Sequence, residues 1–219
     1  MSSAHLVVMA GGSGTRFWPK STLKKPKQLL SFEGLSSRTL LEQTLDRFLG
    51  WIPPEQQWIV TTSILTEAVR AQAGAAHVLS EPQGRNTAPC IYWAAQEIAK
   101  KDPNAVMMVM PSDHFIRDVP AFLSTVKSAV DWAIKSGDLV TLGIAPTRPE
   151  TGYGYLKTAT PDGTKSGAIR VEAFVEKPDL ERARQFVSQP HYLWNGGMFV
   201  WTVSSILAEF DRLMPEMQR

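Results

Sequence analysis

A run of six apolar residues, AVMMVM at positions 105–110, most constrains the fold of this chain. A continuous run without alternating polar positions is typical of a strand covered on both faces, as in the centre of a parallel sheet. Segments of helical apolar spacing separate it from other β-rich runs at residues 5–10, 58–62, 77–79 and 139–144. Parallel strands need crossover connections, which such helices supply. The sequence therefore predicts an α/β fold with a Rossmann-like open sheet, mixed but mostly parallel, and helices on both faces.

The remaining elements follow from the same patterning. Helical apolar spacing predicts helices at residues 39–49, 64–73, 86–101, 119–136, 180–188 and 204–213. After Pro146 glycines become frequent, and they separate short strands at residues 153–158, 168–175 and 192–201. We therefore expect two halves, about residues 1–145 and about residues 146–219, with no clear linker between them.

The composition excludes several classes of protein. The formal net charge of +2 is too small for the electrostatic field of a nucleic-acid-binding or membrane-surface protein. No apolar stretch approaches the ~20 residues of a membrane span, and the N-terminus carries no signal-peptide pattern. Cys90 is the only cysteine, which is typical of a reducing compartment. We therefore expect a cytoplasmic protein without nucleic-acid or membrane partners.

A glycine-rich stretch, MAGGSGTR at residues 9–16, directly follows the first predicted strand. Glycines in such a turn let backbone N–H groups approach an anion closely. The dinucleotide pattern G-x-G-x-x-G fails, because Phe17 occupies the third glycine position. The Walker pattern fails as well, because Pro19 replaces the glycine and has no N–H to donate.

Two basic residues accompany this glycine loop. Arg16 ends it, and Lys27 follows in the segment KKPKQ at residues 24–28. Arginine clamps phosphate oxygens with two hydrogen bonds and lysine supplies a mobile charge, so together they would stabilise charge on a departing pyrophosphate. A plain surface turn explains the glycines alone equally well, but it does not explain both cations beside them.

AGGSGTRFWPKS, followed by KKPKQLL, resembles the signature of the sugar nucleotide pyrophosphorylases. The Trp18-Pro19 pair and the PKQ at residues 26–28 resemble the mannose-1-phosphate guanylyltransferase branch, although Thr22 stands where the family has a basic residue. The stretch EPQGRNTAP at residues 81–89 is similar to the one this branch uses around guanine. The resemblance thus implies a nucleotide-binding set comprising Ala10, Gly11, Gly12, Gly14, Thr15, Glu81, Pro82, Arg85, Asn86 and Thr87. Asn86 is also expected to cap the helix that begins there.

The segment MPSDH at residues 110–114 ends the predicted central strand. Open α/β sheets bind ligands at this edge, and a carboxylate there suits Mg²⁺, which also takes phosphate oxygens. The resemblance implies that Asp113 is the metal ligand, Mg²⁺ the cofactor, and Arg16, Lys27 and Asp113 the catalytic residues. The alternative for Asp113 is a helix-capping role.

Three later motifs resemble the sugar-contacting parts of the family: TGYGY at residues 151–155, VEKP at 175–178 and WNGGMF at 194–199. The resemblance implies that they bind the sugar phosphate through Tyr153, Gly154, Glu176, Lys177 and Asn195. A hairpin or bulge explains the first motif as well, and a surface ion pair explains the second.

The resemblance implies transfer of GMP from GTP to mannose 1-phosphate, giving GDP-mannose and pyrophosphate. The attacking phosphate oxygen is already an anion, so the reaction needs no general base. A sibling transferase with another base or sugar, and a non-catalytic nucleotide- or sugar-phosphate-binding subunit, remain alternatives. The oligomeric state is open, a homodimer included.

The same resemblance bears on the domain organisation. The family has a second metal-binding carboxylate after the W-N-x-G segment, and we find no replacement between Phe199 and Arg219, where Asp211 is expected on a helix face. We therefore expect residues 1–219 to form a C-terminally truncated nucleotidyltransferase domain. Its first half, to about residue 145, would bind the nucleotide, and its second half the sugar phosphate.

Overall fold

The computed structural model describes residues 3–12, 18–23, 25–32, 37–159 and 167–218. The chain forms two compact units. The first unit comprises Met1–Leu139 and Val200–Arg219, and the second comprises Val140–Phe199. The start of the second unit is close to the predicted boundary at about residue 146. The last twenty residues differ from the prediction, because a long strand leads the chain back into the first unit at Val200.

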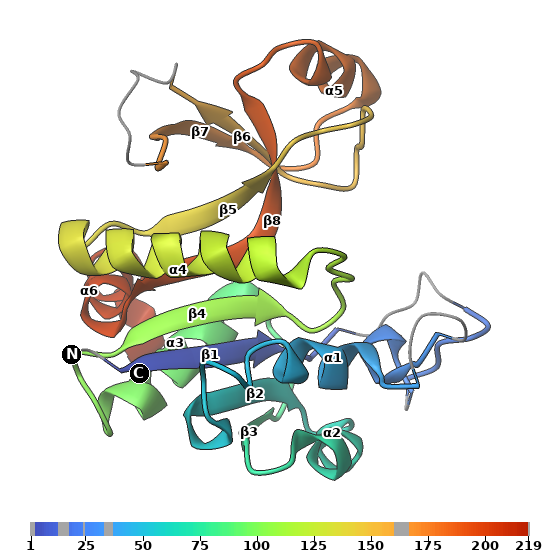
Figure 1. The fold of residues 1–219 in the computed structure, drawn as a ribbon, viewed down its shortest axis with the longest axis vertical. Helices are drawn as coiled ribbons and strands as arrows, with labels where there is room; N and C mark the ends of the chain where they lie inside the picture. The colour runs from blue at the N-terminus through green and yellow to red at the C-terminus, as the bar shows by residue number, and fades with distance from the viewer. Residues whose placement is uncertain (1–2, 13–17, 24, 33–36, 160–166, 219) are drawn as a thin grey trace. The chain divides into compact units, whose positions relative to one another are not determined.

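The first unit is built on four parallel strands: β1 (Ala4–Met9), β2 (Gln57–Thr62), β3 (His77–Glu81) and β4 (Val106–Pro111). They pair in the order β3-β2-β1-β4, so β1 and β4 run side by side (Figure 1). Every residue from Val106 to Met110 is at most 1% exposed, as expected for the strand predicted from the apolar run. The parallel register brings the carboxyl ends of β1 and β4 together at Met9 and Pro111.

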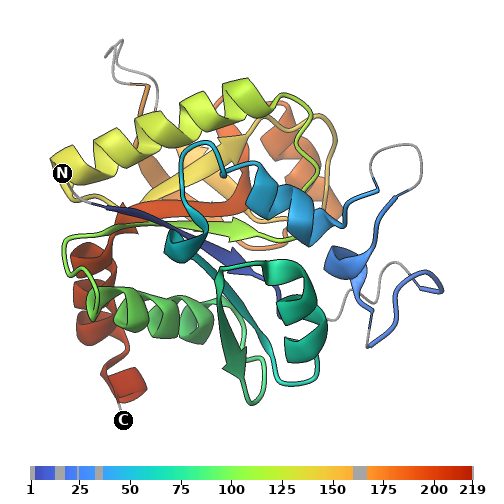
Figure 2. The ribbon, with the colours of Figure 1, turned by 60° about the horizontal axis from the view of Figure 1, so that its bottom comes forward.

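Helices cover both faces of this sheet. Figure 2 shows α1 (Leu40–Asp46) and α4 (Val119–Ser136) on one face, and α3 (Thr87–Ala99) and α6 (Val203–Leu213) on the other. A further helix, α2 (Thr66–Ala73), connects β2 to β3. Short 3-10 helices at η2 (Lys27–Leu29), η3 (Pro54–Gln56) and η4 (Pro215–Gln218) were not predicted, because one turn carries too little periodicity to be recognised.

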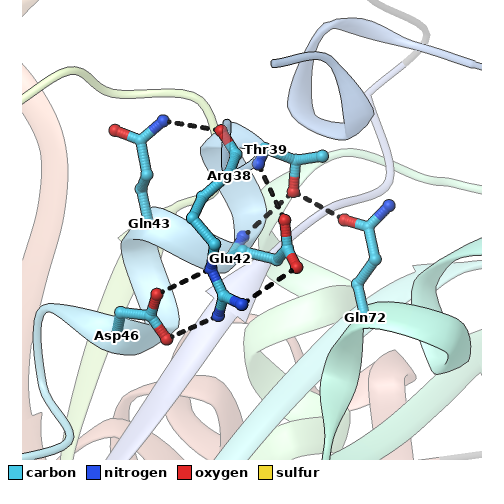
Figure 3. A network of polar contacts seen from close by, with 6 residues as sticks. All are labelled: Arg38, Thr39, Glu42, Gln43, Asp46 and Gln72. Atoms are coloured by element: carbon cyan, nitrogen blue, oxygen red, sulfur yellow. Dashed lines mark hydrogen bonds and ion pairs between the residues drawn. The ribbon is translucent and has the colours of Figure 1, made fainter. Parts of the chain in front are cut away.

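A polar network fixes the start of α1 (Figure 3). Thr39 and Glu42 form a reciprocal capping box, in which each side chain accepts a hydrogen bond from the other residue's backbone N–H. Thr39 Oγ1 also donates to Gln72 on α2. Arg38 binds both carboxylate oxygens of Asp46, one helix length further on. The network defines where α1 begins and ties α1 to α2.

The second unit contains β5 (Val140–Ile144), β6 (Tyr155–Thr158), β7 (Val171–Val175), α5 (Leu180–Val187) and most of β8 (Tyr192–Thr202). β6 pairs antiparallel with both β7 and β8, and β5 pairs with β8. Its core contains Tyr155, Ala183, Phe186 and Trp194. The hydrogen-bonded strands thus form a mixed sheet that is parallel in the first unit, which confirms the predicted fold class.

Candidate functional site

The start of the glycine loop is held by a buried glutamine. Gln28 Nε2 donates to the carbonyl oxygens of Ala10 and Gly12, at 2.9 Å in each case. Thr61 Oγ1 also donates to the Ala10 carbonyl at 3.1 Å. These bonds connect the segment that carries Lys27 to the end of β1. The carbonyl groups of Ala10 and Gly12 are therefore held in place where β1 ends, at the start of a loop that would have to approach phosphate closely.

The Glu81 segment lies against the same loop. A Cβ added to Gly11 would lie 3.7 Å from Glu81 Oε2 and 3.6 Å from the Thr62 methyl group, so backbone and carboxylate are in van der Waals proximity. Glu81 is 8% exposed, and burial raises the pKa of its carboxyl group. Ser63 N–H donates to the Glu81 carbonyl and Ser63 Oγ to that of Pro82, which anchors the segment at the end of β3. Glu81 thus provides a carboxylate acceptor beside the glycine loop.

Asn86 does not cap its helix through its side chain, which differs from the expectation. It occupies the N-cap position of α3, but its side chain makes no capping hydrogen bond. Its backbone has φ 69° and ψ −163°, a region that non-glycine residues rarely adopt. In this conformation the first N–H groups of α3 receive no side-chain acceptor from Asn86. The neighbouring Arg85 and Thr87 are both exposed.

Lys177, which was predicted to bind the sugar phosphate, also has a strained backbone. Among the described residues, Asn86 and Lys177 are the two non-glycine residues with positive φ, at 69° and 41°. Both belong to the sets inferred from the motifs. Such strain persists where surrounding structure imposes it, and it is concentrated at functional sites.

Lys27 and Asp113 form an ion pair, with 3.3 Å between Nζ and Oδ2. Lys27 is the first residue of η2, and Asp113 follows the end of β4. A hydrogen bond from the Ser112 N–H to the Met9 carbonyl joins the ends of β4 and β1. The two side chains are 25% and 39% exposed, so both remain open to a ligand. The pair lies where parallel strands end, which is where such sheets bind ligands.

The loop after Asp113 is supported from α1. Arg47 donates to the His114 carbonyl at 3.2 Å, and its guanidinium lies 5.6 Å from the centre of the Phe122 ring. Burial lowers the pKa of Arg47 to about 10, and burial also lowers the pKa of His114. The His114 carbonyl thus connects this loop to the C-terminal end of α1.

The donor set available for a metal was tested against Mg²⁺. Over the described ranges, no group of three His, Cys, Asp or Glu side chains is arranged to hold a metal ion. Asp113 offers a partly exposed carboxylate after the end of β4. This fits Mg²⁺ bound by few protein oxygens together with phosphate oxygens, and it does not fit a closed protein cage. Asp211 is on α6 and exposed, as expected.

The second unit brings together all five of its predicted residues around Gly154. The Asn195 N–H donates to the Gly154 carbonyl at 2.8 Å, and Glu176 Oε2 lies 3.0 Å from where a Cβ of residue 154 would be. Glu176 pairs with Lys177 at 3.1 Å. The Tyr153 ring packs edge-on against Trp194, which precedes Asn195. One small region thus presents a carboxylate, an ammonium and an amide.

Gly154 has a packing reason in addition to its predicted role. A Cβ there would lie 2.7 Å from Phe174 Cζ, closer than real Cβ contacts occur. The Phe174 ring of β7 would therefore have to move to admit a side chain here, whereas the φ of Gly154 is not positive and does not by itself favour glycine. Gly197, in the WNGG turn, does have positive φ at 63°, which favours glycine at that position.

The sequence-based set is not completely covered. Gly14, Thr15 and Arg16 lie outside the described residues. Sequence reasoning missed Gln28 and Thr61 as supports of the loop. Gln28 is adjacent to Lys27, but nothing in its neighbours indicates that it donates to residues 16 and 18 positions earlier.

Within the part of the chain that the structure describes, no helix has both the length and the apolarity needed to span a bilayer.

Curated proteins match this chain over nearly its whole length. Mannose-1-phosphate guanylyltransferase of Salmonella muenchen is 41% identical over 224 residues, which cover 99% of this chain and 46% of that protein. Alginate biosynthesis protein AlgA of Pseudomonas aeruginosa is 38% identical over 214 residues, covering 94% of this chain and 43% of that protein. The chain thus spans about half the length of these relatives.

A solved structure also matches this chain over nearly its whole length. A crystal structure from Thermus thermophilus, described as mannose-1-phosphate geranyltransferase, matches with a TM-score of 0.89 and 35% identity. The match covers 98% of this chain and 62% of that one. The family model described as nucleotidyl transferase matches residues 5–219, which span both units. The chain therefore belongs to the nucleotidyl transferase family.

Proposed function

We propose that the chain transfers GMP from GTP to mannose 1-phosphate, giving GDP-mannose and pyrophosphate. The observation that carries this proposal is the Lys27–Asp113 pair, at 3.3 Å, beside a glycine loop at the carboxyl ends of parallel strands. A lysine and a metal-binding carboxylate beside backbone N–H groups suit a triphosphate. The name of the Salmonella relative supports the choice of GTP and mannose 1-phosphate.

In the proposed reaction, a phosphate oxygen of mannose 1-phosphate attacks the α-phosphorus of GTP. The bond from the α-phosphorus to the bridging oxygen of the β-phosphate breaks, and pyrophosphate leaves with the electron pair. The attacking oxygen is already anionic, so no proton has to be removed. Positioning and charge stabilisation then account for catalysis.

The first unit is proposed to hold the nucleotide. Lys27 would stabilise negative charge on the leaving pyrophosphate, together with Arg16 of the glycine loop. Asp113 would bind Mg²⁺, which neutralises phosphate charge when it is bound. Glu81 offers a carboxylate acceptor beside Gly11, and guanine carries N1–H and amino donors that adenine does not present together. Ala10, Gly11 and Gly12, with Gly14 and Thr15, would supply the loop backbone.

The second unit is proposed to hold the sugar phosphate. Lys177 would pair with its phosphate, and Glu176 would accept hydrogen bonds from sugar hydroxyls. Asn195, Tyr153 and the Gly154 backbone complete this set. The Glu176–Lys177 pair has both side chains more than half exposed, at 56% and 57%, so each is accessible to a ligand.

The experiment is pyrophosphate release with Mg²⁺ and mannose 1-phosphate, with GTP, ATP, UTP and dTTP in parallel. The proposal expects release with GTP and little with the others. Lys27→Ala should abolish most of the release, because the lysine is proposed to stabilise the leaving group. Release with another nucleotide would overturn the choice of base. No release with any nucleotide, together with GTP binding in a calorimetric titration, would favour a binding subunit instead.

A further inference from the structure

The orientation of the Asn195 side-chain amide follows from its two contacts in the second unit. Gly197 N–H donates to Asn195 Oδ1 at 3.2 Å, and Thr141 Oγ1 donates to the same oxygen at 3.0 Å. A backbone N–H can only donate, so the atom facing Gly197 must be the amide oxygen. A carbonyl oxygen accepts two hydrogen bonds through its two lone pairs. Both are therefore used within the protein.

The amide nitrogen is left for a ligand. Among the described residues no hydrogen bond to Asn195 Nδ2 is formed, and this side chain is only part-buried. The Asn195 backbone is bonded to Gly154, against which the Glu176 carboxylate packs. The region therefore pairs an N–H donor with a carboxylate acceptor. A hydroxyl group both donates and accepts, so sugar hydroxyls match this combination.

We propose that Thr141 is a positioning residue that fixes Asn195 as a hydrogen-bond donor to a hydroxyl oxygen of the sugar phosphate. This role rests on the proposed function of the second unit. Thr141 lies on β5, outside the three motifs that carry the resemblance. Its hydroxyl has one proton, and the nearer of its two acceptors is Asn195 Oδ1 at 3.0 Å, with the Met198 carbonyl at 3.3 Å. Without the Thr141 hydroxyl, the Gly197 N–H would be the one remaining donor to Asn195 Oδ1 among the described residues.

The test uses Thr141→Val, which removes the hydroxyl at almost constant volume, and Thr141→Ser, which keeps it. Loss of one orienting hydrogen bond should weaken mannose 1-phosphate binding about threefold to tenfold in calorimetry. KM for the sugar phosphate should rise by the same factor, with kcat little changed. Thr141→Ser should stay within about twofold of the parent, since the donor remains.

The chain offers a matched control. Thr158 Oγ1, on β6 of the same unit, donates to the His191 carbonyl at 3.1 Å. Thr158→Val therefore removes an equivalent bond without touching Asn195, and sugar-phosphate affinity should stay at the parental value. In an Asn195→Ala background, Thr141→Val should cause no further loss, because its effect passes through the amide.

The outcomes separate the two proposals. Parental affinity in Thr141→Val, equal losses in Thr141→Val and Thr158→Val, or a full additional loss in the Asn195→Ala background would overturn the positioning role alone. A parent chain that binds GTP but no mannose 1-phosphate would overturn the sugar part of the proposed function, and the role of Thr141 with it.

In the parent, the Asn195 side-chain amide resonances should shift on adding mannose 1-phosphate, and this shift should be reduced in Thr141→Val.

Discussion

Gln28 provides the sharpest test of how the glycine loop is held. Gln28→Leu keeps the volume of this 3% exposed side chain but removes both donations, to the Ala10 and Gly12 carbonyls. Each such bond contributes about 1 kcal/mol net. Ala10 keeps its bond from Thr61, and the exposed Gly12 can be hydrated, so neither carbonyl is fully orphaned. We therefore expect the free energy of unfolding to fall by about 1–2 kcal/mol.

The same change should weaken GTP binding. In the variant, GTP would have to order a loop that these bonds no longer hold, and an ordering cost of about 1–2 kcal/mol lowers affinity by about fivefold to thirtyfold. Gln57→Leu is the matched control, because Gln57 is 1% exposed, lies in the same unit and donates to the Ile52 carbonyl at 3.0 Å. It should lower stability comparably and leave GTP affinity unchanged.

The assays are urea unfolding and a calorimetric GTP titration at one fixed Mg²⁺ concentration. Both variants should unfold at lower urea concentrations than the parent, with similar slopes. Only Gln28→Leu should show weaker GTP binding. If Gln28→Leu lost stability but kept the parental GTP affinity, the loop would be held by other contacts and this reasoning would be refuted.

Three further predictions address the ion pair, the second unit and pH. Asp113→Asn should raise the Mg²⁺ concentration for half-maximal pyrophosphate release at least about tenfold. It should change the free energy of unfolding by less than about 1 kcal/mol, because the ion pair of Asp113 with Lys27 is part-exposed. An unchanged Mg²⁺ dependence would exclude Asp113 as the ligand. Gly154→Ala places a Cβ 3.0 Å from Glu176 Oε2 and 2.7 Å from Phe174 Cζ. It should weaken mannose 1-phosphate binding several-fold in calorimetry, with a stability loss of about 1 kcal/mol because the exposed Phe174 ring can turn; parental affinity would contradict the placement of Glu176. Burial lowers the pKa of His5 below 6.5, and its Nδ1 accepts from Trp58 Nε1. As the pH falls, the His5 imidazole is therefore protonated in the unfolded chain before it is protonated in the folded chain. The stability that the neutral, buried imidazole contributes is complete above pH 6.5 and is lost as the pH falls towards and through the lowered pKa. His5→Gln should lose less stability than the parent between about pH 7 and pH 5.5 in urea unfolding; equal losses would assign the acid sensitivity to other groups.

The fold was largely predictable because its signals are local. The apolar run at residues 105–110 became the buried strand β4, and the alternating helices gave the parallel first unit. Helix ends were less accurate. The predicted helix at residues 39–49 ends at Asp46, since the next residues form turns whose apolar side chains continue the helical spacing.

The site was predictable only where motifs carry it. The glycine loop, Asp113 and the second-unit residues have characteristic neighbours in sequence. The capping role expected of Asn86 was wrong: its backbone has positive φ, and its side chain makes no capping hydrogen bond. Gln28 and Thr141 act through bonds to residues far along the chain, and such contacts leave no periodic pattern.

In the proposed function, the first unit binds the nucleotide and the second unit binds the sugar phosphate. The most direct measurement is amide hydrogen exchange of the same chain with Mg²⁺ and GTP alone, and with mannose 1-phosphate alone. GTP should protect amides at residues 10–12 and 84–88, and mannose 1-phosphate those at 152–155, 176–177 and 195–197. Protection of the second set by GTP alone, with no response to mannose 1-phosphate, would contradict the assignment of substrates to the two units.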